Sequence, residues 1–292
     1  MRAISVLIVF ACFANACVGQ AVGDKKTEQG QSLAQEEVAE QKKTRMLWTD
    51  YYAAQLPKYK IYLAGDPDKK LTVDPQPKFR WKNPVRDASS THGDVFVWTR
   101  NGRVDVVGTI FSYQVEGQRR RVAHGFHSMS AEAVTITRDG RRPFTIPAPG
   151  LVYEPVPNAP KVSTKQSIRM AQMRRISKSF TATVTENNET RQPLRALSEP
   201  IYRFESNDAG RDGAVFAYVF GTDPELILAI ETRSTPTGPK WYFAAGRFTT
   251  HPLQLMYQKS VVWRYRPGEN EVDGYVSQHG IDMQPLIPTI KS

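Results

Sequence analysis

Two stretches of the chain share one pattern of apolar runs and turns. In residues 94–111 an apolar run, the turn Asn101-Gly102 and a second apolar run follow one another. Residues 212–231 repeat this order 120 positions later, with Gly221-Thr222 at the turn. Asn-Gly favours positive φ at both centres of a tight turn, and Gly-Thr-Asp-Pro is turn chemistry of similar kind. Each stretch therefore predicts a β-hairpin.

The correspondence extends upstream of the hairpins. At the same spacing the helical pattern of residues 163–180 matches residues 43–60, and at a spacing of 116 residues 76–85 match residues 192–201. We interpret this as an internal duplication. The alternative is a chance resemblance between two strand-rich halves, because apolar runs resemble each other without common origin.

Both faces of the predicted hairpin strands are apolar. Val215, Ala217 and Val219 point one way and Phe216 and Tyr218 the other, so such strands must be covered on both sides. One helix per repeat covers one face, and the other face is expected to meet a curled part of its own sheet or the other repeat. The predicted fold class is α+β: two tandem repeats, each one helix plus a curved antiparallel sheet of cystatin-like or nuclear-transport-factor-like shape.

The predicted domain order follows from composition. Residues 146–160 hold five prolines, which lack the backbone donor that helices and strands need. We expect a signal peptide (1–20), a polar tether (21–33), a first helix-plus-sheet domain (34–146), a proline-rich linker (147–162), a second helix-plus-sheet domain (163–266) and an irregular C-terminal tail (267–292).

The first twenty residues have the pattern of an export signal. Arg2 precedes the apolar run 4–13, which is too short to span a bilayer, and Ala14-Asn15-Ala16 is a small-residue cleavage site. Cys17 follows directly, where a bacterial lipoprotein carries its lipidated cysteine. Lipidation of Cys17 and ordinary cleavage both stay open, because Ala14 replaces the usual leucine. The mature chain is expected to be periplasmic, extracellular or lipid-anchored, without a transmembrane segment.

The charge balance narrows the class of partner. The chain has 39 Lys and Arg against 29 Asp and Glu, a formal net charge of +10. A basic exported protein favours acidic polysaccharide, anionic lipid or an acidic protein. Nucleic acid is not expected, since no nucleic-acid-binding motif is present. The alternative is that the charge only maintains solubility.

His124 and His127 are the weak catalytic candidates. Residues three apart on a strand face opposite sides, so this pair is not expected to bind one metal, and one buried and one exposed histidine is the simpler interpretation. No Gly-x-Ser-x-Gly, His-Glu-x-x-His or phosphate-loop motif is present. Asp223 and Glu225 form a carboxylate pair at a predicted turn, for which a solvated turn is the simpler reading. We expect no cofactor and no metal, and an enzyme is less expected than a binding protein.

A basic group on the second predicted helix is the candidate anion-binding site. It lacks intervening acids and comprises Lys165, Arg169, Arg174, Arg175 and Lys178. Long cationic side chains can converge on one anion, although such runs are commonly solvated surface. Arg119, Arg120 and Arg121 form a second basic group.

Four segments carry a resemblance to a known family. They are HGFHSMS (124–130), Gln172-Met173-Arg174, RQPLRALSEPIYRFE (191–205) and DGAVFAYVFGTDPE (212–225). The chain resembles, most clearly from Asn83 to Trp263, a family of exported planctomycete proteins of unknown function. The resemblance implies location and architecture, and no activity.

Together these patterns predict an exported, non-catalytic scaffold or binding protein for an anionic component of the cell envelope or its surroundings. The alternative is a hydrolase that acts on an envelope or extracellular polymer and uses His124 or His127. A structural subunit of a larger assembly is the third possibility, and it would expose a large apolar patch.

Overall fold

The computed structural model describes residues 21–83, 91–115, 120–186, 190–205, 210–269 and 274–283. The predicted signal peptide with Cys17, and Arg119 of the second basic group, lie outside this range. Residues up to Lys43 and residues from Thr44 onward form separate units. The paragraphs below concern the second unit, apart from the extent of the first helix.

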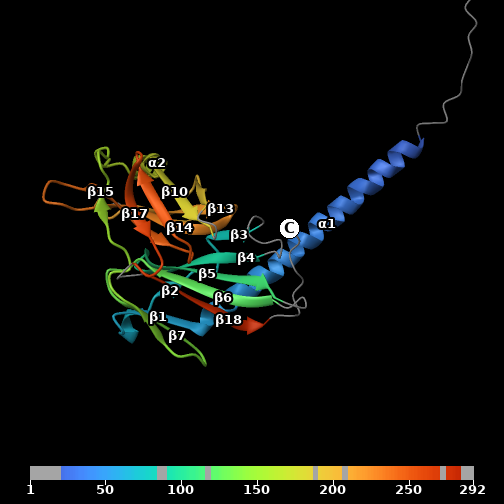
Figure 1. The fold of residues 1–292 in the computed structure, drawn as a ribbon, viewed down its shortest axis with the longest axis horizontal. Helices are drawn as coiled ribbons and strands as arrows, with labels where there is room; N and C mark the ends of the chain where they lie inside the picture. The colour runs from blue at the N-terminus through green and yellow to red at the C-terminus, as the bar shows by residue number, and fades with distance from the viewer. Residues whose placement is uncertain are drawn as a thin grey trace, which may run out of the picture. The chain divides into compact units, whose positions relative to one another are not determined.

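The described chain consists of one long helix, α1, a few short helices and many strands (Figure 1). The helices are α1 (Ala21–Ala53), η1 (Leu56–Lys58), η2 (Pro67–Lys69) and α2 (Gln166–Ser177). The strands of the first half are β1 (Tyr59–Leu63), β2 (Thr72–Val73), β3 (Phe79–Asn83), β4 (Thr91–Arg100), β5 (Arg103–Gln114), β6 (Arg120–Ser128), β7 (Val134–Arg138), β8 (Phe144–Ile146) and β9 (Glu154–Pro155). Those of the second half are β10 (Phe180–Thr185), β11 (Arg191–Ala196), β12 (Tyr202–Phe204), β13 (Gly213–Phe220), β14 (Asp223–Arg233), β15 (Lys240–Arg247), β16 (Leu253–Tyr257), β17 (Ser260–Tyr265) and β18 (Tyr275–Met283).

Helix α1 is longer than the sequence pattern predicts. It begins at Ala21, so the segment 21–33, expected to be an irregular polar tether, is helical. This segment contains Lys25, Lys26, Glu28, Gln29 and Gln31, residue types whose intrinsic helix propensity does not need an apolar face. In the second unit the buried side chains near the end of α1 are Trp48 and Tyr52, followed by Leu56 of η1.

The strands form curved antiparallel sheets, as predicted, and the fold class is α+β. One sheet has the order β18-β6-β5-β4-β2, with β3 also paired to β4. A nine-stranded sheet has the order β17-β16-β10-β11-β13-β14-β15-β9, with β12 paired to β13. The strands β1, β7 and β8 form a third, small sheet. Every pairing between the described strands is antiparallel.

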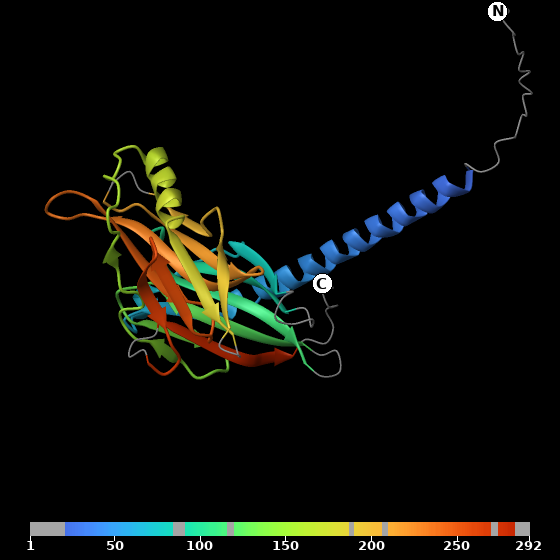
Figure 2. The same cartoon turned by 45° about the horizontal axis from the view of Figure 1, so that its top comes forward.

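Three apolar clusters confirm that both faces of each hairpin are covered. Val95 and Val97 of β4 pack in one cluster with Val215 and Ala217 of β13, between the two large sheets. The other face of β4 packs against α1, β1 and β7. The other face of β13 packs against α2, β10 and β16. The curled strands and α2 therefore lie on the outer sides of two sheets that face each other (Figure 2).

The two hairpins have the same register. Trp98 pairs with Val106 before a bulge, and Tyr218 pairs with Leu226 before a bulge at the equivalent step. Asn101 and Gly102 have φ of 53° and 77°, which confirms the predicted tight turn. The β3 and β12 strands also pair equivalently, with a spacing of 123 rather than the 116 expected from the sequence, since Phe79 and Tyr202 lie opposite Val95 and Val215.

Two edge strands cross between the halves. Strand β9, from the predicted linker, pairs with β15, and β18, from the predicted irregular tail, pairs with β6. The tail prediction is therefore wrong for residues 275–283, which cover the otherwise open edge of β6. Residues 147–162 are not a linker between separately packed domains either: Leu151, Val156 and Val162 are buried, and the halves share one compact unit from Thr44 onward.

Candidate functional site

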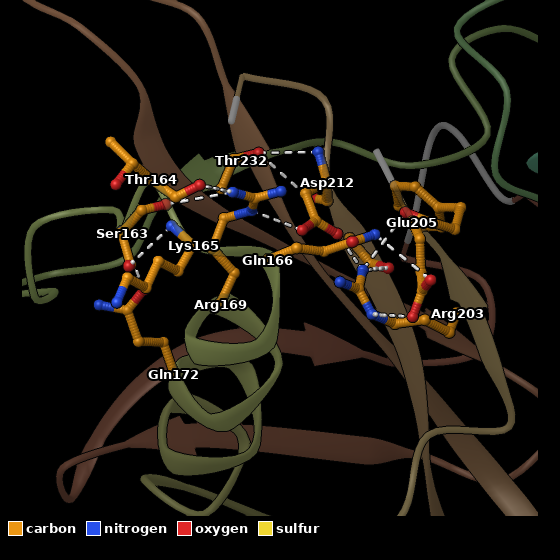
Figure 3. Close-up of polar contacts among 12 residues, drawn as sticks. Ser163, Thr164, Lys165, Gln166, Arg169, Gln172, Arg203, Glu205, Asp212 and Thr232 are labelled. Carbon is orange, nitrogen blue, oxygen red and sulfur yellow. Dashed lines mark hydrogen bonds and ion pairs between the residues drawn. The ribbon is translucent and has the colours of Figure 1, made fainter. Parts of the chain in front are cut away.

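The basic group on α2 does not form one site. Arg169 is fully buried, and its Nε donates to Asp212 Oδ2 at 2.5 Å while Nη1 donates to the carbonyl oxygen of Thr164 at 2.8 Å. Arg203 pairs with the other carboxylate oxygen of Asp212, so the two guanidinium groups lie on either side of that carboxylate (Figure 3). Arg169 is thus a structural residue that ties α2 to β13, and it is not available to a ligand.

The other four cations of this group are exposed but do not converge. Arg174 forms an ion pair with Glu199. Arg175 and Lys178 are exposed at the C-terminal end of the helix, whereas Lys165 is its N-cap residue. Positions about ten residues apart on a helix lie nearly three turns from each other. The predicted five-residue anion site is therefore corrected to scattered surface charges.

His124 and His127 are both buried in the core. His124 is completely inaccessible, and its Nδ1 lies 2.6 Å from the hydroxyl of Tyr59. The Nδ1 of His127 lies 2.8 Å from the carbonyl oxygen of Ser128, and its ring faces Gly246 of β15. The two rings thus point to opposite faces of β6, as predicted, but the expectation that one of them is exposed is wrong.

Asp223 and Glu225 both lie against other parts of the fold. No cluster of three or more possible metal ligands occurs within the part of the chain that the structure describes. Asp223 accepts a hydrogen bond from Asn83 Nδ2 at 3.0 Å, and Glu225 is buried on β14. The predicted pair at the turn is therefore not a solvated pair, because the turn packs against β3.

A pocket of about 180 Å³ lies where α1, β3 and β4 meet the turn between β13 and β14. We call it the Asp94 pocket. Its lining includes Trp48 and Thr49 of α1 and Gly93 of β4, and Thr222 contributes from the turn. The hydroxyl of Thr222 accepts from the backbone N–H of Lys82 at 2.9 Å, which fixes the turn against β3. The second half of the chain therefore completes a pocket built mainly by the first.

Three cations line this pocket. Arg45 comes from α1, and Arg80 and Lys82 come from β3, where residues two apart lie on the same face. Among the described residues neither Arg45 nor Lys82 has a carboxylate within 4.0 Å, and Arg80 has Asp94, 3.9 Å from its Nε. The lining carries three positive charges and one carboxyl group. The pocket is therefore electropositive both when Asp94 is protonated and when it is ionised.

Asp94 is the buried carboxyl group of the pocket. Its side chain is 4% exposed, and its Oδ2 accepts no hydrogen bond within the described chain. Burial raises the pKa of Asp94 from 3.8 to about 6, against the opposing effects of Arg80, a hydrogen bond with Thr49 and Arg45. The carboxyl group therefore changes its charge within the physiological pH range.

His92 is part of a buried hydrogen-bond network beside Asp94. Its Nδ1 lies 2.9 Å from the hydroxyl of Tyr52, which also lies 2.8 Å from Ser112 Oγ. Burial, and then the charges of Arg120 and Arg45, hold the pKa of His92 well below 6.5. The imidazole is thus neutral at pH 7, and the charge behind this network belongs to the buried Arg120, whose Nε donates to Ser112 Oγ at 3.1 Å.

The second half of the chain has a different residue at the position equivalent to Asp94. Arg203 lies opposite Ala214 as Arg80 lies opposite Asp94, so the second half has no carboxyl group at the Asp94 position. Asp212 lies at the strand position of His92, and its carboxylate is occupied by Arg169 and Arg203. The second half therefore has Ala214 where the first half has the carboxyl group of Asp94.

Sequence reasoning missed the Asp94 pocket. Arg80, Lys82, His92 and Asp94 are separated from Arg45 by a helix end and two strands, so no local motif joins them. One signal was present: the alternation of Arg80 and Lys82 places two cations on one face of a short strand. A buried Asp within an apolar strand, flanked by His92 and Val95, was the second.

Helices that are long and apolar enough to cross a membrane do not occur in the described part of the chain. Comparison of the chain with protein-family models, with curated proteins and with solved structures finds no match.

Proposed function

We propose that this chain is an exported, non-catalytic binding protein for an anionic component of the cell envelope or its surroundings, and that the Asp94 pocket is its binding site. The observation that carries the proposal is the convergence of Arg45, Arg80 and Lys82 on one pocket beside a single carboxyl group. Acidic polysaccharide, anionic lipid and acidic protein are the partner classes, since each offers a negative group to such a pocket.

The size of the pocket supports recognition of one group rather than a long segment. A cavity of 180 Å³ has room for about six water molecules, which is the space of one small ring with its substituents. Trp48 adds apolar surface beside the cations. A polymer would therefore be held by one residue or one end.

The test is binding of the mature protein to polygalacturonate, dextran sulfate and phosphatidylglycerol vesicles at low and high salt. We expect the Arg80→Gln, Lys82→Gln double variant to lose at least tenfold in affinity. The matched control is the Arg175→Gln, Lys178→Gln double variant on α2, which removes the same charge and is expected to bind as the wild type does. Equal losses in both variants would assign binding to overall charge, and absence of binding to all three probes would refute the proposal.

A hydrolase acting on such a polymer is the second candidate. The raised pKa of Asp94 favours it, because a general acid works best with a pKa near the operating pH. Against it, the described lining of the pocket holds no second carboxyl group for a glycosidase pair. The binding assay should therefore include chromatography of each polymer after incubation, and fragments that disappear in the Asp94→Asn variant would favour the enzyme.

Export through residues 1–20 remains part of the proposal, with lipidation of Cys17 and simple cleavage as its two forms. Mass spectrometry of the protein recovered from its native host separates them. A fatty-acylated N-terminal cysteine indicates a lipid anchor, an unmodified N-terminus near residue 17 or 21 indicates simple cleavage, and an intact Met1 would contradict export.

We also propose that the two halves arose by duplication. The support is the common register of β3, β4, β5 and β6 with β12, β13, β14 and β15, including the bulge at the same step. An experimental structure whose halves superpose strand by strand, with Arg80 on Arg203, is the expected result. Halves that match in the hairpins alone would favour convergence.

A further inference from the structure

The carboxyl group of Asp94 is buried in the lining of the pocket that is proposed to bind the ligand. Its Oδ2 accepts no hydrogen bond from the described chain, and the nearest cationic nitrogen, Arg80 Nε, lies 3.9 Å away. This distance is too long for a hydrogen bond. Leaving a buried polar atom without such a bond is unfavourable, so a ligand that offers a hydrogen-bond partner to Oδ2 gains affinity.

The groups around Asp94 leave it as the group of the pocket that titrates near neutrality. His92 is held neutral near pH 7 by burial and by Arg120. Burial raises the pKa of Tyr52 well above 10. On the neighbouring strand β5 the residue opposite Asp94 is Ile110, which carries no charge. The charged and titratable groups of the packed elements are thus Arg45 and Tyr52 of α1, Arg80 and Lys82 of β3, His92 of β4 and, behind Tyr52 and Ser112, Arg120 of β6.

An anion and an ionised Asp94 would repel each other in this space. A protonated Asp94 instead donates its O–H to an anionic oxygen, and Arg45, Arg80 and Lys82 then balance the charge of the ligand alone. The proton comes from solvent and returns there when the ligand leaves.

Resting on the proposed function, we propose that the Asp94 pocket binds a ring-sized organic carboxylate, such as a uronic acid residue, together with one proton held on Asp94. The carboxylate of the ligand accepts from Asp94 and from the cations, and its ring lies beside Trp48. The second half of the chain lacks this device, because Ala214 replaces Asp94 and the nearby Asp212 is held between Arg169 and Arg203.

The test is calorimetric titration of the mature protein with glucuronate and galacturonate at pH 5, 6, 7 and 8, in pairs of buffers with different ionisation enthalpies. The sugar carboxylate itself does not titrate in this range. For the wild type we expect an affinity that falls towards tenfold per pH unit above pH 6, and uptake of up to one proton per ligand at pH 7. Inorganic phosphate and glucose are the comparison probes, and both are expected to bind at least tenfold more weakly than the uronates.

Two variants separate this inference from the proposed function. Asp94→Asn keeps a hydrogen-bond donor without the titration, so its affinity should be independent of pH between 5 and 8 with no proton uptake. Asp105→Asn is the matched control, because Asp105 is also buried with its pKa raised to about 6 but lies outside the pocket. It should bind with the pH dependence of the wild type.

The outcomes are distinct. Uronate binding that is lost in the Arg80→Gln, Lys82→Gln double variant but shows no pH dependence and no proton uptake would overturn the inference and leave the proposed function standing. Tighter binding of phosphate than of uronate would overturn the ligand class. Absence of uronate, phosphate and polymer binding at all four pH values would refute both proposals.

Discussion

Gly246 of β15 lies directly against the ring of His127 of β6: a Cβ atom on Gly246 would stand 2.4 Å from His127 Nε2. The two residues are also equivalent, since His127 pairs with Val107 and Gly246 pairs with Ile227 in the matching hairpin strands. The spacing between these two equivalent residues is 119, one less than the spacing of 120 between the hairpins. Two equivalent positions thus meet where the two sheets face each other. The imidazole of His127 fits there because Gly246 has no side chain.

The Gly246→Ala variant is expected to be destabilised by about 1–3 kcal/mol, because the new methyl group forces the buried ring of His127 to move. Urea unfolding measures the change. In the His127→Ala, Gly246→Ala double variant the added methyl group has room, so the loss should be smaller than the sum of the two single losses. Strict additivity would show that the contact does not determine the packing here.

The Arg169→Ala variant is expected to lose about 3–5 kcal/mol of stability. It leaves the fully buried carboxylate of Asp212 with one of its two guanidinium partners. Thermal unfolding measures the loss, and Arg175→Ala on the exposed face of the same helix should keep the melting temperature of the wild type. A loss of similar size in both variants would show that the buried ion pair with Asp212 does not explain the result.

The stability of the wild type is expected to fall as the pH rises through about 6, because the pKa of Asp94 is raised from 3.8 to about 6 in the folded state. The folded chain holds this proton more tightly than the unfolded chain, so the contribution of Asp94 is complete below pH 4 and is lost above pH 6. Relative to the wild type, the free energy of unfolding of Asp94→Asn should therefore rise by about 2 kcal/mol between pH 4.5 and pH 7.5. A constant difference over this range would show that Asp94 ionises normally.

The Tyr275→Ala variant tests whether the C-terminal strand is part of the core. Tyr275 is 9% exposed, its ring lies 4.4 Å from the guanidinium carbon of Arg247, and it packs near Phe248. Loss of the ring is expected to cost about 3–5 kcal/mol in chemical unfolding. Val261→Ala, at an exposed position of β17, is the control and should be nearly neutral. A neutral Tyr275→Ala would mean that β18 is dispensable.

The central elements were predictable from local pattern. Alternating apolar runs placed both hairpins, and the Asn101-Gly102 turn has the backbone conformation that its residue types favour. The need to cover two apolar faces also predicted that the second face would meet either a curled part of its own sheet or the other repeat, and the cluster shared by β4 and β13 shows the contact with the other repeat. These features depend on residues close in sequence, where turn chemistry and side-chain alternation decide the structure.

The faces of the helices and the identity of the site were not predictable in the same way. The helical pattern of residues 163–180 suggested Ile168 as a buried residue, whereas Ile168 is 46% exposed and Arg169 is buried. The ion pair with Asp212 lies more than forty residues away in sequence and reverses the usual preference of an arginine for solvent. The Asp94 pocket needs Arg45, β3, β4 and Thr222 together, so only the three-dimensional arrangement shows it.

The exchange of edge strands between the halves has a consequence for the order in which the chain folds. Strand β6 pairs with β18 across about 150 residues, for example His127 with Tyr275, while β15 of the second half receives β9 from an earlier segment. Contacts of such sequence separation form slowly, because a long loop must close first. When the first half has emerged from the ribosome, β4, β5 and β6 have all been synthesised. Strand β18, which pairs with the edge of β6, has not. The first sheet reaches its native edge only when the last part of the chain has been synthesised.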